Sequence, residues 1–167
     1  MPKLIKDGIL TQNEWQWLVT DEAAPSAEAL ETGKWIVPFS VYLTLKSEGL
    51  GNAKNLGVWL ASADNVQDLA PHLKDLNIVG LNFEKFADGR SFSQARIIRE
   101  QLDFGGEIRV NGDFYQDQMF YLARSGVNAF LIEDDANSES MIESLSDFSD
   151  SYQAACDEPQ PLFRRRV

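Results

Sequence analysis

The fold is decided by two short apolar segments near the middle of the chain, Leu56-Gly57-Val58-Trp59-Leu60-Ala61 and Ile78-Val79-Gly80-Leu81-Asn82-Phe83. Neither segment contains a charge, which is typical of strands that are buried on both faces of a parallel sheet. Each segment is followed by a stretch with helical periodicity, over about 65–74 and about 91–102. This alternation predicts two consecutive strand–helix units with right-handed crossovers.

The same alternation extends in both directions along the chain. Upstream, Trp35-Ile36-Val37 predicts a strand, and Pro38 suits the start of a helix that continues to about Glu48. Downstream, the pattern predicts strands at 107–111 and 127–132 and helices at 114–124 and about 138–154. Five such units predict an α/β fold with a mainly parallel sheet. Periodicity leaves open whether the sheet is an open doubly wound one or a partial β/α barrel.

The chain is divided into three parts by composition. Residues 1–34 are expected to be a preamble packed on the domain, residues 35–154 a single α/β domain, and residues 155–167 a tail. In the preamble, the Asp7-Gly8 pair predicts a hairpin turn, and a capping box of Thr11 and Glu14 predicts a short helix that carries Trp15 and Trp17. Residues 21–33 are expected to form a loop.

Three later helices show a cap residue followed three positions on by Gln, a pattern that marks a helix start. The three pairs are Asp64 with Gln67, Ser91 with Gln94, and Asp113 with Gln116.

Composition restricts the class of function. One cysteine, Cys156, excludes a disulfide within the chain, and one histidine, His72, excludes a His-rich metal site. The net charge of −11 argues against general nucleic-acid binding, which needs clustered cations. No apolar run approaches the length of a membrane span, and no signal peptide is visible. We therefore expect a cytoplasmic protein without a nucleic-acid partner, a membrane partner or a metal site.

The polar residues that follow the predicted strands are the first candidates for chemistry, because sites in such folds lie at the carboxyl ends of the strands. Glu84, Lys85, Asp113 and Glu133 stand at these positions and are candidates for acid–base catalysis. The carboxylates of Asp64, Glu84, Asp113 and Glu133 could also hold a divalent cation such as Mg²⁺. The simpler interpretation is that Asp113 is a helix cap.

A second candidate site lies on the helix after the third strand. Arg90 precedes this helix, while Arg96 and Arg99 flank its apolar face. With Asp88 and Asp113, these arginines are expected to bind a small oxyanion, a phosphate or a partner protein. The alternative is that the arginines form internal salt bridges with Asp88, Glu84 or Asp113.

No nucleotide-binding glycine motif and no nucleophile elbow is present. The chain ends in an apolar pair, Leu162-Phe163, followed by three arginines, which is typical of a frayed tail and also suits a docking element.

Several runs resemble an uncharacterised bacterial family whose members carry a domain of unknown function and the label "oxidoreductase probably involved in sulfite reduction". The runs cover most of residues 56–132 and include Asp88-Gly89-Arg90, Ser93-Gln94-Ala95-Arg96, Arg99-Glu100, Gly106-Glu107-Ile108-Arg109, Gly112-Asp113, Asp117-Gln118 and Ala123-Arg124-Ser125-Gly126. Many members have Cys where this chain has Ser125. The resemblance implies a link to sulfite reductase and to assimilatory sulfur metabolism, without supplying a mechanism.

A sulfite reductase itself is excluded by the residue chemistry, because its sirohaem–iron–sulfur centre is held by several cysteines and this chain has one. We therefore expect an accessory protein that binds sulfite reductase or a small anion. The alternative is an oxidoreductase or barrel-type enzyme acting on a small anionic substrate, with flavin or Mg²⁺ and no visible cofactor motif.

Overall fold

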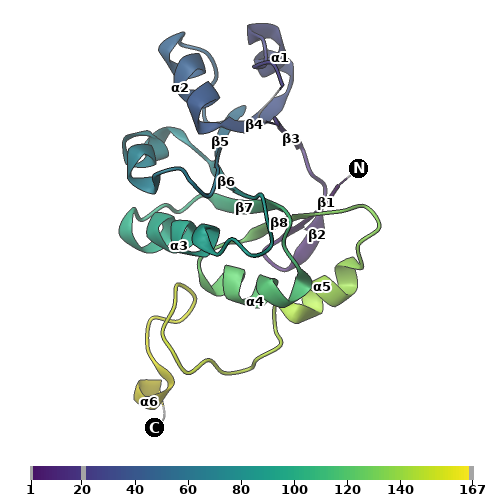
Figure 1. The fold of residues 1–167 in the computed structure, drawn as a ribbon, viewed down its shortest axis with the longest axis vertical. Coiled ribbons are helices and arrows are strands. Elements are labelled where there is room, and N and C mark those ends of the chain that lie inside the picture. Colours follow the sequence, from purple (N-terminus) through teal and green to yellow (C-terminus); the bar gives the residue numbers. More distant parts are fainter. Residues whose placement is uncertain (1, 20–21, 166–167) are drawn as a thin grey trace.

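The computed structural model describes residues 2–19 and 22–165, in which eight strands form one sheet in the order β2-β1-β8-β7-β6-β5-β4-β3 (Figure 1). The strands are β1 (Lys3–Lys6), β2 (Ile9–Thr11), β3 (Trp15–Trp17), β4 (Lys34–Pro38), β5 (Leu56–Leu60), β6 (Ile78–Phe83), β7 (Glu107–Gly112) and β8 (Ala129–Ile132). The α-helices are α1 (Ala27–Thr32), α2 (Phe39–Ser47), α3 (Arg90–Arg96), α4 (Gln116–Arg124), α5 (Ser138–Ser144) and α6 (Leu162–Arg165). Two further helical segments are not α-helical. They are the 3₁₀ helix η1 (Val66–Asp75) and the π-helix η2 (Ile97–Gln101), which continues α3.

The predicted α/β fold is confirmed, whereas the sheet is mixed rather than mainly parallel. Parallel ladders join β3 through β8, and β1 pairs antiparallel with both β8 and β2. The predicted hairpin accounts for the antiparallel pairing of β1 with β2, because Asp7 and Gly8 adopt positive φ values of 50° and 76° and reverse the chain there.

The sheet curls strongly, because its two edge strands, β2 and β3, are separated by three residues of the chain. In a flat sheet, seven strand spacings would place the edges roughly 34 Å apart. The four Cα–Cα steps from Thr11 to Trp15 span at most about 14 Å. The edges therefore lie close together, as in a partial barrel and unlike an open doubly wound sheet.

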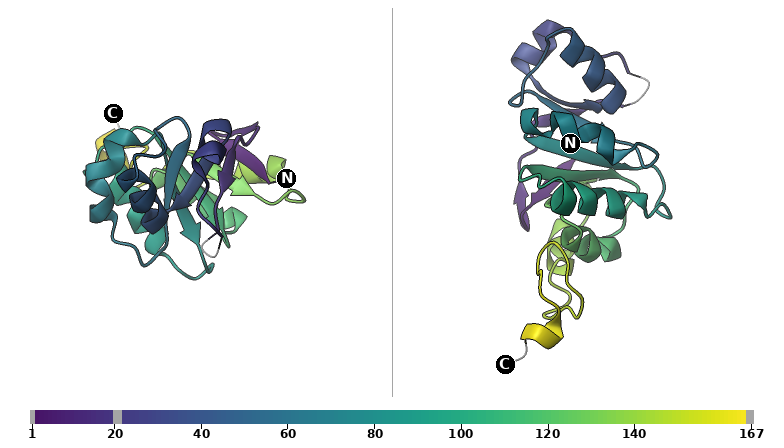
Figure 2. Two further views of the ribbon diagram at one scale, coloured as in Figure 1. Left: turned by 90° about the horizontal axis from the view of Figure 1, so that it is seen from above. Right: turned by 90° about the vertical axis from the view of Figure 1, so that its left-hand side faces the viewer.

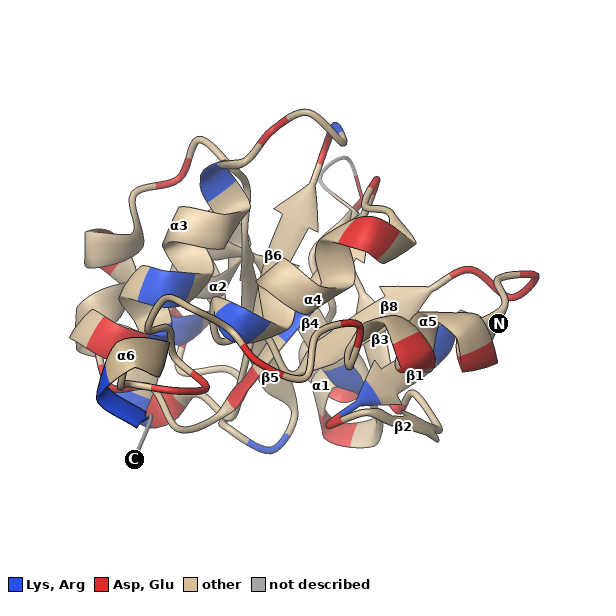
Figure 3. Ribbon diagram, turned by 90° about the horizontal axis from the view of Figure 1, so that it is seen from below, with Lys and Arg blue, Asp and Glu red and all other residues tan. Residues whose placement is uncertain are grey.

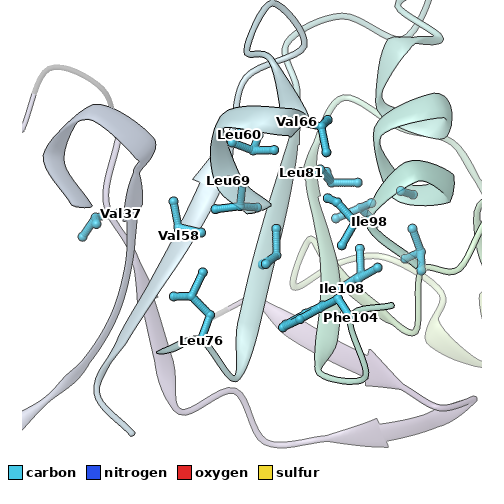
Figure 4. Packing of buried hydrophobic residues seen from close by; sticks show 14 of the residues in the cluster. Val37, Val58, Leu60, Val66, Leu69, Leu76, Leu81, Ile98, Phe104 and Ile108 are labelled. Atoms are coloured by element: carbon cyan, nitrogen blue, oxygen red, sulfur yellow. The ribbon is translucent and has the colours of Figure 1, made fainter. Parts of the chain in front are cut away.

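The helices cover one face of this curled sheet. The main core lies between helical residues such as Leu69 and Ile98 and strand residues such as Val58, Leu81 and Ile108 (Figure 4). Viewed from the helical side, the helices stand in front of the strands, with the N-terminal hairpin behind them (Figure 2). Among the described helices, none has the length and apolar character needed to cross a bilayer.

The other face of the sheet is concave and is filled by side chains of the strands. Ile36, Trp59 and Ile78 form one buried cluster against Trp15 and Trp17. Leu4 of β1 with Ala129 and Leu131 of β8 form a second cluster, on the strands beyond β7.

Between these two clusters lies Arg109 of β7, which is 1% exposed. Its Nε donates to Oε1 of Glu107 at 2.7 Å, and its Nη1 donates to Oδ1 of Asn13 at 2.8 Å. Lys6 Nζ lies 2.8 Å from Oε2 of Glu107. Asn13 belongs to the connection between β2 and β3, so this buried network ties the two edges of the sheet to its middle.

The predicted helix at Thr11–Leu18 is wrong, because this segment contains β3. Trp15 and Trp17 stand two residues apart, so both indoles point to the concave face, and strand pairing with β4 satisfies their backbone. The predicted loop at 21–33 contains the short helix α1, whose N-cap Ser26 accepts a hydrogen bond from the Ala29 N–H. Residues 20 and 21 and the terminal Arg166 and Val167 lie outside the described residues.

The helix starts are displaced by one or two residues from the predicted caps. Asn65 rather than Asp64 caps η1, and Tyr115 with Gln118 rather than Asp113 with Gln116 forms the capping box of α4. Ser91 lies inside α3 and is buried. The helix predicted to reach residue 154 ends at Ser144.

Candidate functional site

The carboxyl ends of β6 and β7 are shaped by a glycine. Gly112 has φ of +102°, and a Cβ at this position would lie 2.2 Å from the carbonyl oxygen of Phe83. This close approach lets the Asp113 N–H donate to the Phe83 carbonyl at 2.8 Å. The Asp113 carboxylate in turn accepts from the Phe86 N–H at 3.0 Å. Asp113 is therefore held at the end of β7 by the connection that follows β6.

A cavity of about 440 Å³ opens beside Asp113 at this end of the sheet. We call it the rim cavity. It is lined by the carboxyl ends of β7 and β8, the chain before β1 and the start of α5: Pro2, Asn111, Gly112, Asp113, Phe114, Tyr115, Leu131, Ile132, Glu133, Ala136 and Met141. Its volume lies within the range of small-molecule sites in proteins.

The four candidates for catalysis are thus divided. Asp113 and Glu133 line the rim cavity together. Glu84 and Lys85 are exposed on the connection after β6 and lie outside the cavity lining. The charge of Glu84 contributes instead to raising the pKa of Arg90, behind the larger effect of Asp88.

Arg90 lies at the start of α3 and pairs with its own neighbour. Its Nε donates to Oδ1 of Asp88 at 2.8 Å, and its Nη2 donates to Oγ of Ser62 at 3.0 Å. The hydrogen bonds from Arg90, followed by one from Ser62, hold the pKa of Asp88 well below its usual range. This is one of the internal salt bridges that the sequence left open.

Arg96 lies on the exposed face of α3 and pairs with Glu100 one turn later, Nε to Oε2, at 2.8 Å. This contact, rather than burial, raises the pKa of Arg96 and lowers that of Glu100. The thiol of Cys156 lies 3.5 Å from the other oxygen of Glu100. Arg96 therefore faces the C-terminal segment.

Arg99 is half-buried and donates to backbone carbonyls of two loops. Its Nε and Nη2 donate to the Gly126 carbonyl at 3.0 and 2.8 Å, and its Nη1 donates to the carbonyls of Phe104 and Gly106. Burial lowers its pKa. These loops precede β7 and β8, so Arg99 lies at the opposite end of the strands from the rim cavity.

The structure therefore does not gather the candidate anion- or partner-binding residues into one site. Asp88 and Arg90 form a pair at the start of α3, and Arg96 faces the C-terminal segment. Arg99 and Asp113 lie at opposite ends of the strands. Within the described residues, no group of three His, Cys, Asp or Glu side chains is placed to hold a metal ion.

A further surface feature was not predicted from the sequence. Phe120 of α4 contacts its neighbour Tyr121 and also Phe148 of the chain after α5, with ring centroids of Phe120 and Phe148 5.0 Å apart. We call Phe120, Tyr121, Phe148 and Tyr152 the aromatic cluster, and they border a hollow of about 230 Å³. Tyr121, Phe148 and Tyr152 are 57%, 58% and 67% exposed. No sequence signal marks the cluster, because tertiary folding brings α4 to the later segment.

No curated protein and no solved structure has detectable similarity to this chain. A match to a family of bacterial proteins covers residues 57–163, which include β5 from its second residue, β6 to β8, the rim cavity apart from Pro2, and the aromatic cluster. The chain therefore belongs to the family described as bacterial protein of unknown function, DUF934.

Proposed function

We propose that this protein is an accessory protein of assimilatory sulfite reduction that binds a partner enzyme, sulfite reductase, through the aromatic cluster. The metabolic context rests on the resemblance of residues 56–132 to proteins labelled as involved in sulfite reduction. The binding role rests on one structural observation, the group of exposed aromatic rings on α4 and the segment after α5.

Exposed aromatic side chains on one surface support protein binding, because aromatic residues are enriched where interfaces are most tightly packed. Scattered apolar residues are normal on a protein surface, whereas a contiguous group of large rings is not. The ring of Phe120 contacts both Tyr121 on α4 and Phe148 in the chain after α5. A partner that covers these rings would remove their apolar area from water.

Charge around the cluster supports a partner with a basic surface. Residues 125–163 contain nine acids and no Lys or Arg. In Figure 3, acidic segments are spread over α5 and the chain that follows, while basic segments lie on α3 and α6. Arg124 beside the cluster is paired with Asp157 at 3.2 Å, and Arg165 of α6 donates to the Ser151 carbonyl. Such a surface attracts a partner that presents Lys and Arg.

The decisive experiment is size-exclusion co-elution of the purified protein with sulfite reductase from the same organism, with the visible spectrum recorded in the same run. We expect a complex that weakens as ionic strength rises from 50 to about 500 mM, because surface charges are screened. The double variant Phe148→Ser, Tyr152→Ser is expected to lose most of the binding.

The matched control is Phe86→Ser. Phe86 is also an exposed aromatic residue, but its ring contacts Tyr115 beside the rim cavity instead of the aromatic cluster. This variant should co-elute like the wild type. Failure of the wild-type protein to associate at low salt would overturn the proposal. Equal loss of binding in the Phe86→Ser control would place the interface elsewhere and would reject the aromatic cluster.

A second candidate function, an enzyme acting on a small molecule, is favoured by the rim cavity, where Asp113 and Glu133 lie at the carboxyl ends of neighbouring strands. This candidate covers the oxidoreductase and barrel-type alternatives with flavin or Mg²⁺ as cofactor. A small anionic substrate would need a cation such as Mg²⁺ beside Asp113 and Glu133, because these two carboxylates alone would repel it. A thermal-unfolding series with FMN and with millimolar Mg²⁺ tests it. A rise in Tm that grows with ligand concentration would support the candidate, and an unchanged Tm would reject both cofactors.

A further inference from the structure

The rim cavity differs in character from the oxyanion site that the arginines suggested. Among the described residues that line it there is no Lys, Arg or His, whereas Asp113 and Glu133 bring two carboxylates. Lys3 lies at the edge of the cavity but outside its lining, since its Nζ donates to the carbonyl of the lining residue Ala136 at 3.3 Å. An oxyanion in this cavity would face two like charges, which is unfavourable.

The wall of the cavity is mostly apolar, and several of its side chains are buried in the protein core. Phe114, Leu131 and Ile132 are buried on the protein side, and Met141 of α5 and Pro2 close two further sides. A cavity with an apolar wall and a few polar groups is typical of a site for a small organic molecule. Among the described residues, no three acidic, His or Cys side chains are grouped to enclose a metal ion.

Two carboxylates reach the cavity from the ends of neighbouring strands. The Asp113 carboxylate accepts from the Phe86 N–H, and the backbone of Glu133 is fixed by the Ala136 N–H, which donates to the Glu133 carbonyl in the turn that leads to α5. Asn111 lies on β7 and is paired across the sheet with Asn82. The side chain of Asn111 adds an amide oxygen that can accept a further hydrogen bond.

We propose that the rim cavity binds a small organic cation, a primary amine on a compact apolar body, with Glu133 and Asp113 receiving the ammonium group. Phe114, Leu131 and Met141 contact the apolar body. Ammonium–carboxylate hydrogen bonds are stronger than neutral ones, so two carboxylates in one cavity favour the cation over its neutral or anionic analogue. This inference is independent of the partner-binding proposal, because the aromatic cluster and the rim cavity share no residue.

The test compares two probes of nearly the same shape and opposite charge, 2-phenylethylamine and 3-phenylpropionate, in ¹H–¹⁵N NMR titrations of the full chain at pH 7. We expect the amine to shift the amide signals of Gly112, Asp113 and Glu133 and the carboxylate to leave them unchanged. The variant Glu133→Gln should raise the Kd for the amine about tenfold, since one charge-assisted hydrogen bond becomes a neutral one.

The matched control is Glu139→Gln, because Glu139 is also an exposed glutamate on the segment around α5 but is outside the cavity lining. It should leave the Kd unchanged. A second variant, Ala136→Leu, fills part of the cavity and should weaken the amine while the spectrum stays folded. The proposal is overturned if the amine gives no shifts at 20 mM, if the carboxylate binds equally well, or if Glu133→Gln and Glu139→Gln have the same effect.

Discussion

Gly80 of β6 lies directly beneath the indole of Trp17 in β3, such that a Cβ added to Gly80 would stand 2.5 Å from Cη2 of Trp17. It would also stand 2.8 Å from Cβ of Trp59, whose ring stacks on Trp17 with centroids 5.9 Å apart. An edge strand can reach a central strand in this way only because the sheet is curled. The absence of a side chain at Gly80 thus leaves room for the tryptophan pair on the concave face.

Replacing Gly80 with alanine is expected to destabilise the fold by about 1–3 kcal/mol, the usual cost of overpacking a filled core. The free energy of unfolding from urea titration, followed by tryptophan fluorescence, measures this change. Gly89→Ala is the control, because a Cβ at Gly89 meets nothing within 4 Å. Equal stability of the two variants would contradict the packing described for Trp17.

The buried network around Arg109 gives a second prediction. Arg109→Met leaves Glu107 in the interior with only Lys6 as a charged partner and removes the hydrogen bond to Asn13. Breaking a buried ion pair from one side leaves an uncompensated charge, so we expect a loss of about 3 kcal/mol. Denaturant unfolding measures it. Arg96→Met is the comparison, because the exposed Arg96–Glu100 pair is expected to contribute about 0.5 kcal/mol or less.

Arg99 is expected to be a structural residue. Arg99→Ala leaves the carbonyls of Gly126, Phe104 and Gly106 without this donor, and we expect a loss of about 2–3 kcal/mol of stability. Arg99→Lys should recover little, because one ammonium cannot reproduce the planar geometry of the guanidinium. Thermal unfolding of both variants measures these effects. A wild-type Tm for Arg99→Ala would show that the two loops hold their shape by themselves.

Cys156 is expected to be an unreactive thiol in the native protein. Burial, followed by the contact with Glu100, raises its pKa from 9.0 to about 11. Since the thiolate is the reactive form, its population at pH 8 falls about a hundredfold relative to an unperturbed thiol. The rate of reaction with DTNB at pH 8, native against urea-unfolded, measures this difference. The variant Glu100→Gln should accelerate the native reaction, and a fast native reaction in the wild type would contradict the prediction.

The pair of Asp88 and Arg90 predicts a pH dependence at the acid end. Because the folded-state pKa of Asp88 lies below its ordinary value of 3.8, the pair stabilises the fold above that pH and loses its effect as pH falls towards the folded-state pKa. Carboxyl ¹³C NMR titration of Asp88 measures the folded-state pKa. In Arg90→Gln this pKa should return towards 3.8, and an unchanged value would assign the effect to Ser62.

Much of the fold follows from local patterns in the sequence. The apolar segments at Leu56–Leu60 and Ile78–Phe83 became β5 and β6, because runs without charge are stable only when buried on both faces. The Asp7-Gly8 turn predicted the hairpin because it adopts positive φ readily. The cap positions failed by one or two residues, since several neighbouring polar side chains compete for the same N–H groups.

The site residues were only partly predictable for a different reason. The rule that polar residues after parallel strands share one edge predicted that Asp113 and Glu133 lie near each other, and both line the rim cavity. It could not place Pro2, which reaches the cavity from the other end of the sequence, or Met141, which reaches it from α5. Arg90, Arg96 and Arg99 are close in sequence but have different hydrogen-bond partners: Ser62, Glu100 and the Gly106 carbonyl, respectively. They differ because residues three or six positions apart on a helix lie at different heights along its axis and at different angles around it.

The sequence by itself determined the strand–helix alternation, the hairpin and the family, because these depend on residue type and spacing over short stretches. Only the tertiary structure decided that Trp15–Trp17 is a strand and that the sheet curls until its edges approach. It also decided which arginines are paired with carboxylates of this chain. These features depend on contacts between residues distant in sequence, such as Trp17 over Gly80 and Asn13 with Arg109, whose free energy no local pattern reports.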